Sequence, residues 1–138
     1  ISTIAPYIQN AYKTVEDYTG IQFGEDFLFH IMHPDESDWV LHSEKSAIAL
    51  CIFKEYFPNQ SVEIASDIQY ALNFEGRDLT DDDTYLHLLE KYEIEPDDFY
   101  KKFIRITFIN LLRDLLKLTH RYNLKIKFSN VRGEIYTL

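Results

Sequence analysis

The stretch that decides the fold is Gln69–Leu89, QYALNFEGRDLTDDDTYLHLL, in which two helix-like runs meet at a single glycine. The apolar stripe of the first run ends at Glu75, so Gly76 stands where a left-handed residue commonly closes a helix. Arg77 then places a positive charge beyond the helix end, where the helix dipole favours it. Thr80 begins a Thr-x-x-Asp capping pattern. The stretch therefore predicts a helix stop followed at once by a helix start. This structural role is preferred to a binding role for Arg77.

The connection between this helix stop and the next helix start is called the joint below. On both sides of the joint, apolar residues at three- to four-residue spacing predict about five helices. The expected helices cover residues 5–20, 42–57, 61–75, 81–92 and the run from 96 to 115 or 122. Weak helix formers in the last run lead us to expect a break near 104–108. Residues 21–39, interrupted by Gly24 and Pro34, are expected to form a long connection. The fold class predicted is mainly α.

Two finer expectations concern the helix faces and the C-terminus. Ser43 is the expected N-cap of the second helix. The residues expected to face inward are Ala47, Leu50, Cys51, Phe57, Ile64, Ile68, Ala71, Leu72, Leu86 and Leu89. Apolar residues alternate with lysines from Leu124 to Phe128, and turn residues follow from Asn130 to Gly133. This pattern predicts a short C-terminal β hairpin ending at Leu138. The predicted domains are thus residues 1–123, helical, and 124–138, a β element.

The composition and charge exclude several classes of protein. A chain of 138 residues with 46% hydrophobic residues suits one packed domain. No apolar run approaches the roughly 20 residues of a membrane helix, and no secretory signal is visible. Residues 1–98 carry 21 acids and 5 bases, whereas residues 99–138 carry 9 bases and 2 acids. The net charge of −9 argues against nonspecific nucleic-acid binding through the whole surface, and no recognition motif accompanies the basic residues.

Few residues offer chemistry. Cys51 is the single cysteine, so it cannot form an intramolecular disulfide, and we expect it to be a buried, unreactive core residue. The one candidate metal constellation is His30, His33 and His42 with Asp35, Glu36 and Asp38, but its spacing matches no closed zinc pattern. We therefore expect a solvated acidic loop there. His87 and His120 stand alone on helices. We therefore expect no catalytic, cofactor-binding or metal-binding residue and no cofactor.

Several spaced positions on both sides of the joint resemble a known family. Ile68-Gln69, Ala71, Gly76 and Asp78 precede the acidic helix start, and Ile94-Glu95 and Phe99 follow it. Over residues 5–103 the chain resembles the helical insertion of DsbA-like thiol-disulfide oxidoreductases, in particular the cytoplasmic FrnE-like branch. The resemblance implies a helical bundle inserted in a thioredoxin-like α/β fold, with residues 124–138 as a remnant of that fold. It also implies disulfide oxidoreductase or isomerase activity on protein or peptide thiols.

The chain departs from this family in the residues that carry the chemistry. It contains no Cys-x-x-Cys pair, and no proline follows Pro96, so the cis-proline loop of the family is missing too. Because the chemistry of the family depends on these residues, we expect the chain to lack its N-terminal strand and redox helix. The function implied is that of a helical part that shapes the substrate surface of an oxidoreductase. The alternative is a helical protein-interaction module without redox chemistry. The oligomeric state stays open.

Overall fold

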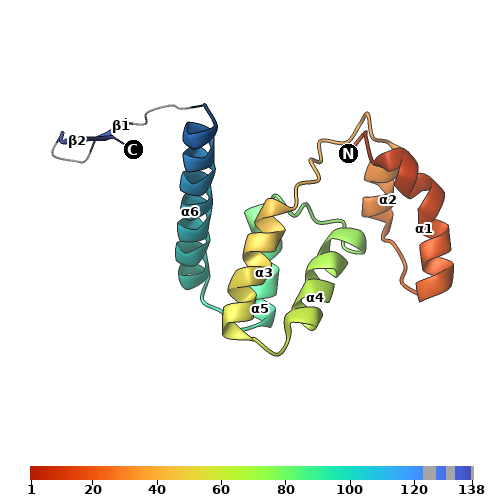
Figure 1. The fold of residues 1–138 in the computed structure, drawn as a ribbon. Helices are drawn as coiled ribbons and strands as arrows, with labels where there is room; N and C mark the ends of the chain where they lie inside the picture. Colours follow the sequence, from red (N-terminus) through yellow and green to blue (C-terminus); the bar gives the residue numbers. More distant parts are fainter. Residues whose placement is uncertain (123–126, 130–132, 138) are drawn as a thin grey trace. The chain divides into compact units, whose positions relative to one another are not determined.

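The computed structural model describes residues 1–122, 127–129 and 133–137 (Figure 1). The chain forms two compact units, Ile1–Tyr100 and Lys101–Leu138, called here the first and second units. Their boundary lies inside the last helix. The expected mainly α class is confirmed, because the described elements are six helices and two strands of three residues each. The expected domain boundary between residues 123 and 124 stays a prediction.

The first unit holds five complete helices and the beginning of a sixth. They are α1 (Ala5–Thr19), α2 (Glu25–Met32), α3 (Glu44–Tyr56), α4 (Ser61–Asn73), α5 (Asp82–Lys91) and α6 (Pro96–Tyr122). The helix α1 packs on α2, and α4 packs on both α3 and α5. Gly20 closes α1 in the left-handed conformation, with φ +73°, as its place after the apolar run predicted.

The helix α2 corrects the expectation of a long connection over residues 21–39. Glu25 and Asp26 lie in its first turn, where acidic side chains favour the helix. Phe27 and Ile31 are one helical turn apart, and both are buried with Trp39 in a small apolar cluster. Gly24 and Pro34 therefore flank a two-turn helix rather than interrupting a loop. The acidic residues of this segment obscured its short apolar stripe.

The buried face of α3 also differs from the expected one. The residues that face the core are Ile48, Ala49, Ile52 and Phe53. Ala47 and Cys51, which were expected to face inward, are exposed, and Leu50 and Phe57 are only half-buried. The register error arose because all residues from Ala47 to Phe53 are apolar, so the sequence marks no single stripe. Ser43 is the N-cap residue, but its side chain makes no capping hydrogen bond.

The helices on either side of the joint agree better with expectation. Ile64, Ile68 and Ala71 of α4 are buried, as predicted, and so is Leu89 of α5. Leu72 is half-buried. Leu86 was wrongly placed in the core, because it is 39% exposed. The inward positions of α5 are Thr84, Tyr85, Leu88 and Leu89, which form two pairs at helical spacing.

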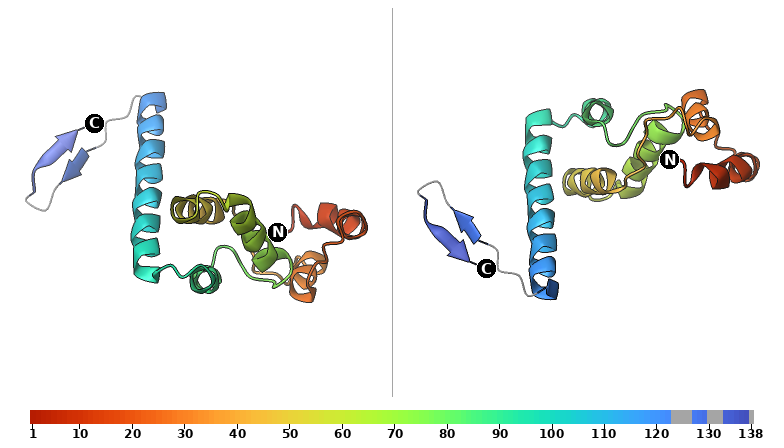
Figure 2. Two further views of the ribbon diagram at one scale, coloured as in Figure 1. Left: turned by 90° about the horizontal axis from the view of Figure 1, so that it is seen from below. Right: turned by 90° about the horizontal axis from the view of Figure 1, so that it is seen from above.

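The last helix, α6, runs unbroken from Pro96 to Tyr122 (Figure 2). The expected break near 104–108 is wrong, since weak helix propensity at a few positions does not outweigh the helix formers around them. Farther on, β1 (Lys127–Ser129) pairs antiparallel with β2 (Ile135–Thr137). Residues 124–126, 130–132 and 138, which carry much of the predicted hairpin, lie outside the described residues.

Candidate functional site

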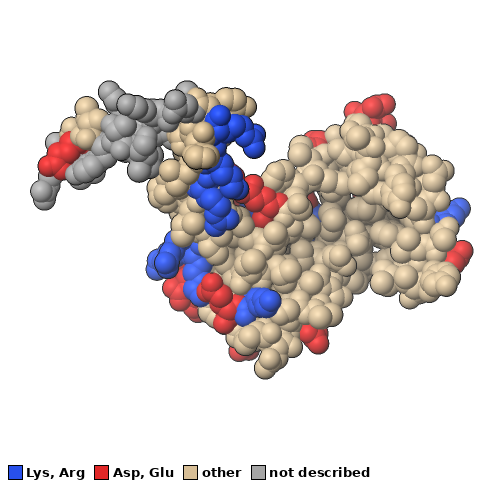
Figure 3. Space-filling model, in the orientation of Figure 1, with Lys and Arg blue, Asp and Glu red and all other residues tan. Residues whose placement is uncertain are grey.

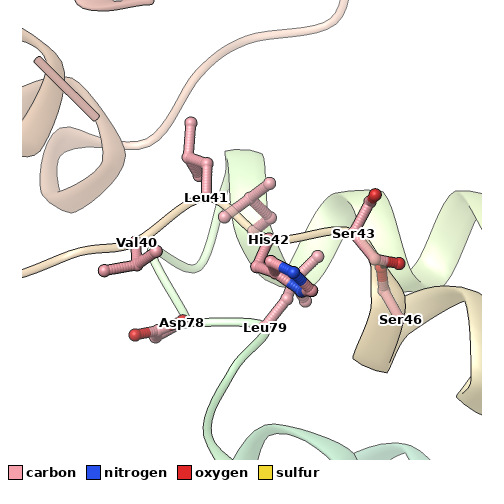
Figure 4. Close-up of a pocket in the computed structure, with 8 residues that line it drawn as sticks. Val40, Leu41, His42, Ser43, Ser46, Asp78 and Leu79 are labelled. Carbon is pink, nitrogen blue, oxygen red and sulfur yellow. Dashed lines mark hydrogen bonds between the residues drawn. The ribbon is translucent and has the colours of Figure 1, made fainter. Parts of the chain in front are cut away.

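A pocket of about 270 Å³ lies in the first unit where the segment before α3 meets the joint (Figure 4). It is called the α3 pocket below. Its lining residues are Val40, Leu41, His42, Ser43, Ser46, Leu72, Asp78 and Leu79. Four of these side chains are aliphatic, and two of the four, Val40 and Leu41, are exposed. The pocket therefore offers an open, largely apolar surface with polar groups at its edge.

Two glycines allow a close backbone contact next to one wall of the α3 pocket. Gly76 has φ +66°, as predicted from its place after α4. A Cβ atom at Gly76 would lie 2.4 Å from Asp26 Cβ, and one at Gly24 would lie 1.8 Å from the Phe74 carbonyl oxygen. The Gly24 amide donates a hydrogen bond to the Asn73 carbonyl oxygen at 2.8 Å. The start of α2 thus packs directly against the end of α4, because neither glycine has a side chain.

The joint itself, residues 76–81, is fixed to the neighbouring helices by hydrogen bonds. Thr84 Oγ1 donates to the Asp78 carbonyl oxygen at 2.6 Å, and Tyr85 Oη donates to that of Leu79 at 2.8 Å. Lys45 Nζ, from α3, donates to the Thr80 carbonyl oxygen at 2.7 Å. Three successive carbonyl groups of the joint are therefore satisfied by side chains of α3 and α5, which holds this wall of the pocket in one conformation.

Tyr85 is the most buried of these supports. Burial, together with the charges of Asp78 and Asp82, raises the pKa of the Tyr85 phenol well above its usual value. The hydroxyl group therefore stays protonated and keeps donating to Leu79. Lys45 Nζ also pairs with Asp82 Oδ1 at 2.6 Å and lies 5.9 Å from the centre of the Tyr85 ring. Lys45, Asp82 and Tyr85 thus brace the joint together.

The polar groups of the α3 pocket are engaged with the nearby chain. Ser46 Oγ donates to the Ser43 carbonyl oxygen at 3.0 Å, and His42 Nδ1 accepts from the Glu44 amide at 3.3 Å. Asp78 Oδ1 accepts from the amide and the hydroxyl of Thr80 at 2.7 and 2.8 Å. The Asp78 carboxylate points away from the His42 ring (Figure 4). This arrangement suits binding better than acid–base chemistry, which needs a base in contact with a nucleophile.

The structure does not assemble the histidines of the candidate metal constellation. The His30 ring stacks on Trp39 with centroids 4.0 Å apart, and its Nδ1 lies 2.8 Å from Ser37 Oγ. His33 Nδ1 lies 3.7 Å from Glu36 Oε1 on the exposed surface. His42 belongs to the α3 pocket instead. In the described part of the chain, no three histidine, cysteine or acidic side chains are placed to hold a metal ion.

The remaining sequence candidates lie apart from the pocket. Cys51 is exposed on α3, which corrects the expectation of a buried thiol. Arg77 does lie beyond the end of α4, but its Nε pairs with Glu75 Oε2 at 2.6 Å. His87 Nε2 is 3.9 Å from the same carboxylate group. His120 is exposed near the end of α6. None of these four residues lines the α3 pocket.

Sequence reasoning missed the residues that brace the joint. Lys45 carried no distinguishing signal, because the chain between it and Thr80 folds back only in three dimensions. Thr84 and Tyr85 could have been found, since they lie one turn before Leu88 and Leu89 on the same face of α5. The N-cap of α5 was misplaced by one residue: Asp81, not Thr80, is the cap, and its side chain accepts from the Asp83 amide at 3.2 Å.

A second polar cluster ties α5 to α4. Asp67 Oδ2 accepts from Lys91 Nζ at 2.7 Å and from Tyr92 Oη at 2.5 Å. Burial acts to raise the pKa of Asp67, but the two hydrogen bonds and the charge of Lys91 outweigh it, so the pKa is lowered. Burial and the Asp67 carboxylate raise the pKa of Tyr92 to about 12. The cluster is therefore an ionic link between helices at neutral pH.

Comparison with known proteins returned no relative. The chain matches no protein-family model, and no curated protein or solved structure is significantly similar to it. Among the described helices, none combines the length and the apolar character that a membrane span requires.

Proposed function

We propose that the first unit binds a segment of another protein and places one of its apolar side chains in the α3 pocket. The observation that carries this proposal is the pocket itself, in which exposed aliphatic residues lie beside a braced joint. A preformed apolar hollow with a few polar groups at its edge is the usual form of a binding site. At the edge, the hydroxyl groups of Ser43 and Ser46 and the carboxylate group of Asp78 can accept hydrogen bonds from the backbone of the bound segment, in addition to the bonds that Ser46 and Asp78 already make.

The resemblance to DsbA-like oxidoreductases supports the same role. Three of the positions that carry it, Ala71, Gly76 and Asp78, lie at or next to the joint that forms one wall of the pocket. In that context the first unit would shape the surface on which protein or peptide thiols and disulfides bind, in a cytoplasmic protein. Exchange also requires an attacking thiolate and a second thiol that resolves the mixed disulfide. The one cysteine of this chain cannot supply both.

The second candidate function is a protein-interaction module without redox chemistry. The exposed, solitary thiol favours it, because Cys51 has no second cysteine in the sequence with which to exchange. Both candidates use the α3 pocket for the same purpose, and they differ only in whether a Cys-x-x-Cys segment acts beside it. The coding sequence immediately upstream of Ile1 distinguishes them. A Cys-x-x-Cys pair there supports the oxidoreductase, and its absence supports the interaction module.

The binding role is tested with a short synthetic peptide that has a central Leu-Phe pair. NMR titration of the full chain should shift the resonances of Val40, Leu41, Leu72 and Leu79 first. The variant Leu79→Asp should weaken binding at least tenfold, a loss of about 1.4 kcal/mol. Its matched control is Val15→Asp, at an exposed aliphatic residue of α1 outside the pocket, which should bind as the wild type does. Equal weakening by both variants, or shifts confined to other helices, would contradict the proposal.

The chemical limit of the chain is tested by insulin reduction. The chain alone should reduce insulin no faster than a small monothiol at the same concentration, because it cannot resolve a mixed disulfide. The variant Cys51→Ser should then differ from the wild type only by that monothiol background. Insulin turnover well above the background would show that Cys51 acts catalytically. It would contradict the proposal that this chain binds the substrate and leaves redox chemistry to a Cys-x-x-Cys segment.

A further inference from the structure

The helix α6 carries an apolar stripe along its part in the second unit. The stripe consists of Ile104, Phe108, Leu111, Leu115, Leu118 and Tyr122. The successive spacings are 4, 3, 4, 3 and 4 residues, which keep the six side chains on one face of a helix over five turns. This spacing is the one by which helices pack side by side along a seam. The set is called the α6 seam below.

The α6 seam is open to solvent. Five of its six residues are between 45% and 68% exposed, and Leu115 is half-buried. Removing apolar surface from water is favourable. A row of large apolar side chains on one helix is therefore a surface that gains by contact with a partner. Isolated exposed apolar residues carry no such meaning, but a seam with regular spacing does.

The charge of the two units indicates what partner fits. Residues 101–122 carry six basic residues and one acidic residue, Asp114, a net charge of +5 (Figure 3). Residues 1–100 carry 21 acids and 5 bases, a net charge of −16. Two α6 helices would repel each other, whereas an acidic surface would attract α6 and orient it. The surface that suits the seam is therefore both acidic and apolar.

The first unit presents such a surface on α4. Val62 and Tyr70 of α4 are eight residues apart, Phe74 caps the helix four residues farther on, and the three are 45% to 79% exposed. The Tyr70 and Phe74 rings are stacked with centroids 4.7 Å apart. Beside them, Ile21 closes a hollow of about 140 Å³ with Tyr70 and Phe74. One acidic residue of the same helix, Glu63, adds negative charge, whereas the other, Asp67, is paired with Lys91. The helix carries no lysine or arginine. This exposed face is called the α4 face below.

We propose that the chain forms a reciprocal dimer in which the α6 seam of each copy docks on the α4 face of the other. The apolar residues of the seam supply the attraction at short range, and the opposite net charges of α6 and of the first unit favour this partner over a second α6 helix. The contact is made twice, because both copies carry both surfaces. A closed pair of identical subunits results, as most homo-oligomers form.

The oligomeric state of the full chain tests this proposal first. Sedimentation equilibrium should give a dimer that dissociates on dilution. The double variant Leu111→Gln with Leu118→Gln should be a monomer at concentrations where the wild type is a dimer. Glutamine is a good helix former, so the helix is retained. A wild-type chain that stays monomeric at all concentrations overturns the proposal.

A matched control separates the seam from general surface effects. Ile109 and Leu116 lie on the same helix, are exposed to a similar degree, and fall outside the seam. The double variant Ile109→Gln with Leu116→Gln should dimerise as the wild type does. Circular dichroism of both double variants checks that their helix content is equal. If the control variant is as monomeric as the seam variant, the seam has no special role and the proposal fails.

Salt distinguishes an acidic acceptor from a second α6 helix. Raising the ionic strength from 0.1 M to 1 M shortens the Debye length from about 10 Å to about 3 Å. If α6 docks on the acidic α4 face, the dimer should weaken as salt is raised. If two basic α6 helices pair instead, salt should strengthen the dimer by screening their repulsion. A dimer that is strengthened by salt therefore overturns the proposed acceptor.

Mixing two defective variants tests the reciprocal arrangement. The variant Tyr70→Gln damages the α4 face and leaves the seam intact, whereas Leu111→Gln with Leu118→Gln damages the seam and leaves the α4 face intact. Each variant alone should be monomeric. Mixed together they retain one of the two contacts, so a weak one-to-one heterodimer should form. A mixture with no more association than its two components would overturn the reciprocal contact.

Discussion

The helices α5 and α6 follow one another in the chain and differ in what their apolar residues do. The helix α5 has 10 residues and buries four of them, whereas α6 has 27 residues, of which only Phe99 is buried. Both show apolar residues at helical spacing. The spacing therefore predicts that a helix forms, but burial depends on whether another element of the same unit packs against it.

The largest effect is expected at the centre of α5. Tyr85→Ala should lower the free energy of unfolding by about 3–5 kcal/mol, because it leaves a large cavity beside Phe99. Tyr85→Phe keeps the ring and removes only the hydrogen bond to Leu79, so it should cost about 1 kcal/mol. Leu111→Ala on α6 should change stability by no more than about 0.5 kcal/mol in the monomer. Urea unfolding of the full chain at low concentration measures all three.

The distinction between packed positions of α5 and exposed positions of α6 would be wrong if Leu111→Ala destabilised the monomer as much as Tyr85→Ala does. That result would mean that the seam of α6 is packed within a single copy. A small effect of Tyr85→Ala would instead show that the joint is not braced by α5 in solution.

The next effect concerns two glycines with the same backbone conformation. Gly76 and Gly133 have φ +66° and +77°, but only Gly76 has close neighbours. Gly76→Ala should cost about 2 kcal/mol or more, since the Cβ atom meets Asp26 in addition to the penalty for positive φ. Gly133→Ala should cost about 1 kcal/mol at most. Thermal unfolding compares the two variants, and equal costs would show that the contact with Asp26 is of no consequence.

A smaller effect is expected from two ionic interactions, one that links α4 to α5 and one on the surface of α6. Asp67→Asn should cost about 1 kcal/mol at neutral pH, because the charged hydrogen bonds from Lys91 and Tyr92 are weakened. Asp114→Asn removes the exposed pair with Lys117 on α6, and should cost less than about 0.5 kcal/mol. Chemical unfolding measures the stability cost of each variant. Equal costs would show that the link between α4 and α5 contributes no more than the surface pair.

The same link gives a pH dependence with a defined sign. The pKa of Tyr92 is raised in the folded chain from 10.0 to about 12. Its contribution to stability is therefore complete below pH 10.0 and is lost as the pH rises through about 12. The stability difference between the wild type and Tyr92→Phe should shrink over this interval. Urea unfolding at several alkaline pH values checks it, and a difference independent of pH would rule out this account.

The smallest effect is expected at Cys51, an exposed position within the packed unit. Cys51→Ser should change the free energy of unfolding by less than about 0.5 kcal/mol. Native protein should react with a thiol reagent about as fast as unfolded protein does, since the side chain is exposed. Labelling that requires denaturant would place Cys51 in the core and reverse the helix face assigned to α3.

The sequence determined the joint and most helix positions, but not all faces. Gly76 was predictable because a left-handed residue at the end of a helix is usually glycine. The face of α3 was not, because its run of apolar residues fits more than one register. The helix α2 was missed because its two turns hold only two buried residues. The α3 pocket depends on Lys45 reaching Thr80 across 35 positions of the chain, and no local pattern contains that contact.

The contact between Gly24 and Asn73 has a consequence for the dynamics of the first unit. The Gly24 amide is shielded from exchange with solvent only while the start of α2 stays on the end of α4. The Arg77 amide donates to the Ala71 carbonyl oxygen at 2.8 Å. It is therefore shielded by the last turn of α4, which also holds the Asn73 carbonyl group. Local opening that releases one should release the other. The two amide protons should therefore exchange for deuterium with nearly equal protection, as members of one cooperative unit.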